Sequence, residues 1–497
     1  MSKRTDPSGA GSAASAGLTA ASTLVVSAFA AIIGVVIARE FGRTDETDGF
    51  FAAYGVFIVI TLAAQSIRIA VLPSLSRARD EMRLAGTVAG FATALTLVAV
   101  PLLILGELGA QSIADLLTGS GSDTAQDACA DALRWMIPAA VAHLYAGLAA
   151  SSLAALDDYV TAALGYAVGS AAGLALILAR VGDDGVVAVS WGMALNGALA
   201  LLVPTAGLAW RAAHARMPAA AVRPVGAPLV SRLGVFAIAA SLPIALQLLY
   251  VVCLPFAGTL GSGAVTSFGY AYLAAASLVT VTAFSIGLVS SVPLTRIGLG
   301  GGMVGRHVTA AAWIALVPIG AAVGAFAVAG APIVERVLGG AYGGDVGSEV
   351  SRLVVLLAPW MVVSVGVNVT FPLAFVADRL RALPWIGAGA LAIQVLLAWV
   401  GVELFELDGL ALSMAVSTLL VLGALLVQLG AIERGLRGVA IAAFVVSVLA
   451  AMAYLPPSLV AGGLPSALAG LAIYVGLVAL LRPRGLRDSW SYLRELR

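Results

Sequence analysis

The chain has 497 residues, of which 61% are hydrophobic and 11% are charged, and its formal net charge is +1. A soluble domain carries about a quarter charged residues, so this composition excludes a large soluble globular protein. The small net charge gives no reason to expect nucleic acid as a partner. The apolar runs are long and continuous rather than alternating, which predicts membrane-spanning helices of about 20 residues each.

The N-terminal 16 residues are small and polar, and we predict a disordered segment on the cytoplasmic side. The apolar run over 17–39 is long enough to cross the bilayer, which favours an uncleaved first span over a secretory signal. Further spans follow along the whole chain, fourteen in all. They are predicted at 50–75, 85–107, 133–155, 159–180, 186–210, 233–257, 265–294, 309–330, 352–376, 382–403, 409–431, 437–455 and 463–481.

The positive charges support this layout. With the N-terminus in the cytoplasm, 20 of the 27 Lys and Arg residues fall in inside loops or termini, and six fall outside. Such a bias is expected of a cytoplasmic (inner) membrane protein, and an odd number of spans would destroy it. Both termini are therefore predicted to be cytoplasmic. One cation, Arg68, is left over, because it lies within the predicted second span.

Similar residues recur at offsets of 220 to 224, which indicates an internal repeat. The pairs are Pro73 with Pro293, Ile113 with Ile333, Asp115 with Glu335, Gly119 with Gly339, Pro138 with Pro359, Asp157 with Asp378, and Asp184 with Asp408. Because each copy contains six helices, an even number, the two copies share one orientation. The predicted fold is an all-α polytopic membrane protein of about 14 helices, with two parallel six-helix repeats and two extra C-terminal helices.

This fold divides the chain into six predicted parts. They are the N-terminus at 1–16, a first lobe at 17–211, a cytoplasmic linker at 212–232, a second lobe at 233–433, helices 13 and 14 at 434–482, and a cytoplasmic tail at 483–497. Where two such repeats form a transporter, the substrate path runs between the two lobes.

Three stretches of the chain carry a resemblance to a known family, namely "IAREFGRTDETDGFFAAYGV" (37–56), "GSGAVTSFGYAYLAAA" (261–276), and "LGYAVGSAAGLAL" with the following "WGMALNGALALLVP". They resemble the MurJ/MviN lipid II flippases of the multidrug/oligosaccharidyl-lipid/polysaccharide (MOP) exporter superfamily. The resemblance implies two lobes in a V shape that alternate between inward-open and outward-open forms. It also implies a lipid carrier diphosphate of the undecaprenyl type as cargo, whose sugar crosses through the cavity for peptidoglycan or other cell-wall synthesis.

The chain departs from the family where the family carries cations. Ile33 and Gly34 occupy the positions of an Arg–Asp pair, "VITLA" (59–63) replaces a twin Arg, and "GYAYLAAAS" lacks an expected basic residue. Asp48 does match the Asp of the family's "DAFF" motif. The resemblance therefore implies a diverged member, with a changed cargo or with transport weakened or lost.

Arg68 is the principal candidate for binding cargo. A charge within the membrane costs about 2.5–3.5 kcal/mol on insertion scales, which argues for a use. As a ligand, its planar guanidinium would bind diphosphate oxygens bidentately. Gln65 lies three residues earlier, on the same helical face. The alternative is that the long side chain bends towards the cytoplasmic headgroups.

The other candidates are polar or aromatic residues within predicted spans. The substrate-binding set is Arg68, Gln65, Asp48, Asn196, Gln247, Tyr250, Tyr270, Tyr272 and Asn368. For the amides, together with His143 and Gln394, hydrogen bonding between helices is the structural alternative. For the tyrosines, it is packing or an interfacial position. No metal site, cofactor or catalytic residue set is predicted, so the chain is not expected to be an enzyme.

Three functions are compatible with the sequence. The first is a flippase for a lipid-linked saccharide. The second is a cation-coupled multidrug exporter of the same superfamily, which would need an acidic residue within the membrane; none is assigned there, which counts against this function. The third is a transport-inactive scaffold, with other envelope-synthesis proteins as partners.

Overall fold

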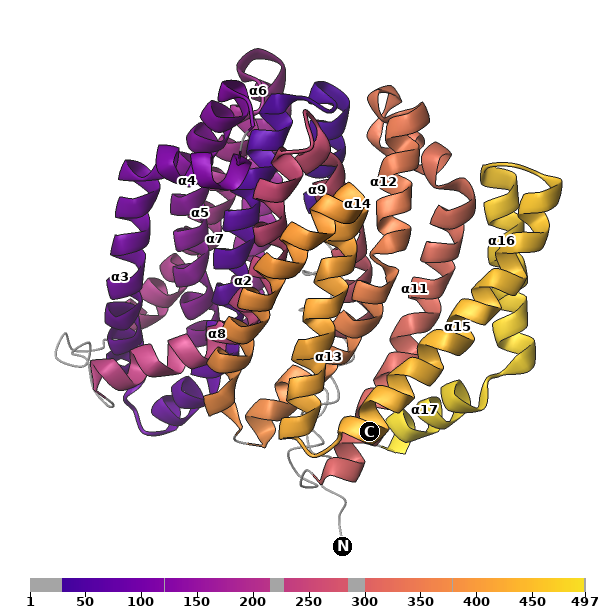
Figure 1. Cartoon of the computed structure of the whole chain (residues 1–497). Coiled ribbons are helices and arrows are strands. Elements are labelled where there is room, and N and C mark those ends of the chain that lie inside the picture. The colour runs from indigo at the N-terminus through magenta and orange to yellow at the C-terminus, as the bar shows by residue number, and fades with distance from the viewer. Residues whose placement is uncertain (1–28, 120, 215–227, 285–299, 378, 496–497) are drawn as a thin grey trace, which may run out of the picture. The chain divides into compact units, whose positions relative to one another are not determined.

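The computed structural model describes residues 29–119, 121–214, 228–284, 300–377 and 379–495 (Figure 1). Within these ranges the chain forms helices and turns and no strand. The all-α prediction is therefore confirmed.

Eleven helices of the described residues are long and apolar enough to cross a membrane, and the number is twelve if one bent pair forms a single span. That pair is α12 (Gly344–Leu356) and α13 (Ala358–Val376), bent by 42°. One of the eleven, α14 (Leu383–Gln428), is broken at Glu406, where φ is 52° and ψ is −133°. It covers the predicted spans 382–403 and 409–431, while the first span lies partly outside the described residues. The number of membrane-spanning helices among the described residues therefore agrees approximately with the prediction of about fourteen spans.

The chain forms two compact units, Met1–Phe41 with Asp45–Gln247, and Gly42–Thr44 with Leu248–Arg497. In the first unit, residues 29–41 are helical. The helices that follow are α2 (Asp45–Asp80), α3 (Leu84–Leu108), α4 (Ala110–Thr118), α5 (Asp123–Ala155), α6 (Tyr159–Asp184) and α7 (Val187–His214). Helix α5 is central to this unit, since it packs against α2, α3, α4, α6 and α7. The boundary between the units falls within α8 (Leu229–Gly258).

The second unit is organised around a long helix, α11 (Gly301–Leu338). Before it come α9 (Ala264–Val279) and a π-helical turn, Thr280–Phe284. After α14 come α15 (Ile432–Val460), α16 (Leu464–Leu481) and α17 (Arg484–Glu495). Helix α11 packs against α12, α13, α15, α16 and α17. Short 3₁₀ turns at Gly340–Tyr342 and Leu380–Ala382 complete the unit.

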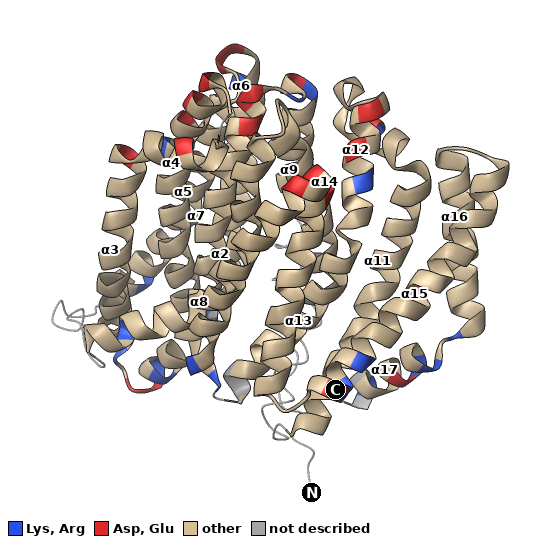
Figure 2. Cartoon of the chain, in the orientation of Figure 1, with Lys and Arg blue, Asp and Glu red and all other residues tan. Residues whose placement is uncertain are grey.

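Charged side chains concentrate at the helix ends of each unit. Figure 2 shows most described Asp and Glu residues at one end and mostly Arg at the other, when each unit is viewed by itself. This distribution supports the predicted orientation, in which the arginine-rich ends face the cytoplasm. The orientation itself and the six-part division remain predictions.

Candidate functional site

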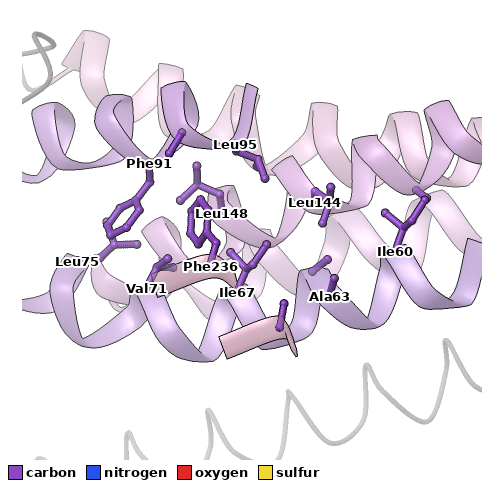
Figure 3. Packing of buried hydrophobic residues seen from close by; sticks show 14 of the residues in the cluster. Ile60, Ala63, Ile67, Val71, Leu75, Phe91, Leu95, Leu144, Leu148 and Phe236 are labelled. Atoms are coloured by element: carbon purple, nitrogen blue, oxygen red, sulfur yellow. The ribbon is translucent and has the colours of Figure 1, made fainter. Parts of the chain in front are cut away.

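Helix α2 has a buried face and, beside it, a polar and aromatic face. The buried face packs into a cluster with side chains of α3, α5 and α8 (Figure 3), among them Ile60, Ile67 and Val71 of α2. Successive residues of a helix are turned by about 100°, so Arg68 points well away from Ile67. We call the neighbouring face the α2 stripe. It consists of Phe50, Tyr54, Phe57, Thr61, Gln65 and Arg68, spaced three or four residues apart.

The aromatic part of the α2 stripe continues onto two other helices. Tyr54 stacks with Phe57, with ring centroids 5.9 Å apart and an interplanar angle of 19°. Phe57 meets the His143 ring of α5 edge-on at 6.0 Å. His143 in turn stacks on Tyr166 of α6 at 6.1 Å, with an interplanar angle of 6°. Three helices of one unit therefore supply a continuous row of rings.

Arg68 lies at the end of this row. Its side chain is half-buried, and it forms no ion pair or hydrogen bond with any residue that the structure describes. Arg68 lies close enough to Tyr166 for its positive charge to interact with the tyrosine hydroxyl. The α2 backbone is fixed here by close packing on α5, where the Ser151 hydroxyl donates to the Arg68 carbonyl at 3.5 Å. A positioned cation beside aromatic rings can bind an anionic group and support a ring-bearing substituent.

Of the other candidates in the first unit, only Gln65 belongs to this site. Its side chain is exposed one turn from Arg68. Asp48 lies on the same helix, but it is 20 positions away, or about 30 Å along the axis. It is buried in the first turn of α2, where a carboxylate interacts favourably with the helix dipole. Asp48 and Arg68 therefore cannot bind one headgroup together.

The two amides of the first unit lie in packed surroundings. Asn196 of α7 donates from Nδ2 to the Ser170 hydroxyl of α6 at 3.5 Å. This contact lies in a region where glycines bring the two helices together, which favours a structural role for Asn196. Gln247 of α8 is 5% exposed.

The three tyrosines of the second unit form part of its interior. Tyr250 is fully buried and stacks on Tyr272 with 4.1 Å between centroids. Tyr272 also contacts the Trp360 ring at 5.3 Å. Tyr270 meets Tyr342 edge-on at 5.4 Å. Because other rings cover these ring faces, the geometry favours a packing role for all three tyrosines.

The amides of the second unit also bond within the protein. Asn368 of α13 donates to the Ser364 carbonyl of its own helix at 2.8 Å. Gln394 is fully buried and donates to the Ser413 hydroxyl at 3.0 Å and to the Cys253 sulfur at 3.2 Å. Among the described residues, no group of three or more His, Cys, Asp or Glu is placed to hold a metal ion.

Sequence reasoning identified Arg68 and Gln65 but missed the rings beside them. The spacing of Phe50, Tyr54 and Phe57 relative to Arg68 would have placed all four on one face. It also missed the burial of Arg232, which was assigned to the end of the linker. Arg232 is 6% exposed near the start of α8, and its Cζ lies 5.3 Å from the centre of the Phe91 ring of α3.

Taken together, the apolar helices define a multi-pass α-helical membrane protein, and its fold is similar to those of solved transporter structures. Among solved structures, the lipid II flippase MurJ in an inward closed conformation matches with a TM-score of 0.73. The match covers 93% of this chain and 98% of that chain at 13% identity. An inward-facing multidrug resistance MATE family transporter gives 0.58, with 84% of this chain and 98% of that chain covered at 15% identity. A eukaryotic MATE transporter gives 0.57, with 87% and 97% covered at 15% identity.

No protein-family model and no curated protein sequence matches the chain. The structural matches confirm, at the level of the fold, the resemblance stated from the sequence.

Proposed function

We propose that the protein is a transporter that moves a lipid-linked saccharide across the cytoplasmic membrane by alternating access. The observation that carries this proposal is the structural match to the lipid II flippase MurJ. It extends over 93% of this chain at a TM-score of 0.73, against 0.58 and 0.57 for the MATE transporters. The proposed location is the inner membrane, with both termini cytoplasmic and the product used in envelope glycan synthesis.

The cargo we propose is a lipid carrier diphosphate of the undecaprenyl type. Arg68 would donate to its phosphate oxygens, because a guanidinium binds phosphate bidentately. Each charge-assisted hydrogen bond is worth about 1.5–3 kcal/mol. The half-buried ring of Tyr166, which lies near Arg68, would contact the attached sugar. Gln65, one turn from Arg68, would supply a neutral donor and acceptor to the same group.

The sequence departures limit the affinity of such a site. With Ile33 and Gly34 where the family has charges, fewer cations than usual would meet the diphosphate. A lone guanidinium suits weak binding and release, which a transporter needs in order to turn over.

A cation-coupled multidrug exporter is the alternative that the MATE matches favour. Such a protein needs a titratable carboxylate within the membrane, and Asp48, which is 6% exposed near the start of α2, is the candidate. Replacing Asp48 with Asn would abolish drug resistance conferred by an exporter. A transport-inactive scaffold would depend on neither Asp48 nor Arg68.

Genetic complementation and lipid retention test the proposal together. The chain should restore growth of a strain depleted of its lipid II flippase, and Arg68→Ala should abolish that growth at equal protein level in the membrane. Arg77→Ala is the matched control, because Arg77 is an exposed arginine of the same helix. Native mass spectrometry of the purified protein should reveal a bound lipid phosphate. Failure to complement, with no such lipid bound, would contradict the proposal.

A further inference from the structure

The segment after the last span forms an amphipathic helix instead of an extended tail. Helix α16 ends at Leu481, Arg482 caps it with φ 41°, and α17 begins at Arg484. The backbone of the turn is closed by Leu486, whose N–H donates to the Pro483 carbonyl at 2.9 Å. Because only two residues separate α17 from a span, the helix must lie close to the membrane surface.

One face of α17 packs against α11. Gly485 lies against the indole of Trp313, where a Cβ would come within 2.2 Å of ring atoms. Two turns later, Tyr492 is 6% exposed, and its hydroxyl lies 3.4 Å from Nδ1 of His307. The Arg306 guanidinium carbon sits 4.8 Å from the centre of the Tyr492 ring. These contacts hold α17 in a fixed orientation on the second unit.

The opposite face of α17 is exposed and basic. Arg484, Arg487 and Arg494 are exposed on it. Trp490 is 54% exposed, with the Arg494 guanidinium carbon 5.9 Å from its ring centre. Residues 482–497 contain five arginines and two acidic residues. An exposed tryptophan beside arginines is the composition of a helix that lies in the membrane interface.

Two other elements add positive charge at the same end of this unit. Helix α15 begins beside the start of α11, since Gly301 lies against the Gly430 carbonyl just before α15. Arg306 of α11 and Arg434 and Arg437 of α15 are all exposed there. Figure 2 shows arginines at this end around α15 and α17. The α17 surface, as we call it, consists of Arg306, Arg434, Arg437, Arg482, Arg484, Arg487, Trp490 and Arg494.

We propose that the α17 surface binds the headgroups of anionic lipids and so enriches them around the C-terminal helices. The charge is complementary to phosphate headgroups, and each arginine near an anionic surface favours binding about fivefold. Trp490 would sit at the level of the headgroups, where an indole is most stable. The inference concerns a part of the molecule separate from the α2 stripe, and it holds whatever the cargo is.

Lipid-specific quenching in the full-length protein tests this inference. Ser491, which is exposed on α17, is changed to Cys and labelled with a fluorophore; the native Cys129 and Cys253 are both buried. The protein is reconstituted in phosphatidylcholine nanodiscs containing a minority of phosphatidylglycerol. Either lipid is brominated in turn, so that quenching measures how strongly each is enriched near the label.

We expect brominated phosphatidylglycerol to quench several times more than its bulk share predicts. The triple variant Arg484→Gln, Arg487→Gln, Arg494→Gln should bring this enrichment close to the bulk share, since three arginines contribute about fivefold each. The matched control removes three arginines predicted at the other end, Arg134, Arg180 and Arg336, and should change nothing.

Raising the salt concentration tests the wild-type protein without any substitution. At about 1 M salt, charges are screened within about 3 Å, compared with about 8 Å at physiological ionic strength. The enrichment should therefore fall towards the bulk share. Equal quenching by the two lipids at low salt, or unchanged enrichment in the triple variant, would overturn the inference. A free phosphate site would instead be recognised by loss of enrichment on adding inorganic phosphate at constant ionic strength.

Discussion

Asp158, at the junction of α5 and α6, should contribute measurably to the stability of the first unit. Its carboxylate caps α6 by accepting a hydrogen bond from the Thr161 N–H at 3.1 Å. It also forms an ion pair with Nη2 of Arg211 in α7 at 2.6 Å. The side chain is 9% exposed, whereas Arg211 is 42% exposed. Loss of a cap costs about 1 kcal/mol. The ion pair adds about 1 kcal/mol, because one partner is largely solvated.

The expected result is a loss of about 2 kcal/mol for Asp158→Ala and of about 1 kcal/mol for Asp158→Asn, which keeps the capping oxygen. Denaturant unfolding in mixed micelles, followed by tryptophan fluorescence, would measure both at neutral pH. Arg180→Ala is the comparison, because it removes an ion pair within one helix, with Asp184, at 2.7 Å. Equal stability of Asp158→Ala and the wild type would refute the reasoning.

The same carboxylate makes stability depend on pH. Burial raises the pKa of Asp158, but hydrogen bonds from Thr161 and the nearby Arg211 outweigh it, so the pKa is lowered below 3.8. A depressed pKa in the folded state stabilises the protein above the ordinary Asp pKa of about 3.9. This contribution is lost as the pH falls through the folded value. As the pH is lowered from about 4, the free energy of unfolding of Asp158→Ala should therefore fall less than that of the wild type.

Two further predictions concern glycine packing and thiol access. Gly173→Ala should destabilise by about 1–3 kcal/mol, because its Cβ would lie 2.5 Å from the Gly192 carbonyl of α7. Gly182→Ala on the same helix should stabilise by about 0.5–1 kcal/mol, since nothing lies within 4 Å of that Cβ; thermal unfolding of both variants checks the opposite signs. Cys129 and Cys253 are both buried, so a maleimide should label neither in the folded protein, and rapid labelling of either would contradict this packing.

Sequence hydropathy predicted the apolar helices well and missed the amphipathic segments. The predicted fourth span began at 133, whereas α5 begins at Asp123. Its first ten residues are too polar on average to signal a span, although Ala125 and Cys129 are buried. Helix α17 was missed for the same reason, because an amphipathic helix beside the membrane has no continuous apolar run. In each case the helix is fixed by packing on neighbours that the local sequence does not reveal.

The candidate site was predictable only in part. Arg68 stood out because a charge is rare within an apolar helix. His143 and Tyr166 come from α5 and α6, and their stacking beside the α2 stripe depends on how those helices pack. The tyrosines Tyr250 and Tyr272 were included in the substrate-binding set because they lie within predicted spans. The sequence could not indicate that the two rings would stack on each other.

Transport by purified protein tests the central claim most directly. Proteoliposomes containing the full chain and a fluorescent lipid diphosphate saccharide are treated with a membrane-impermeant reagent that destroys the fluorophore on one side. The wild type should move the lipid between leaflets, and Arg68→Ala should slow this at least tenfold, because a charge-assisted hydrogen bond worth about 1.5–3 kcal/mol is lost. Arg68→Lys should also be slow, since lysine reaches the headgroups as well as arginine does but lacks the planar fork. Arg77→Ala should transport normally. Wild-type rates in Arg68→Ala would contradict the account, as would a wild-type protein that moves no lipid.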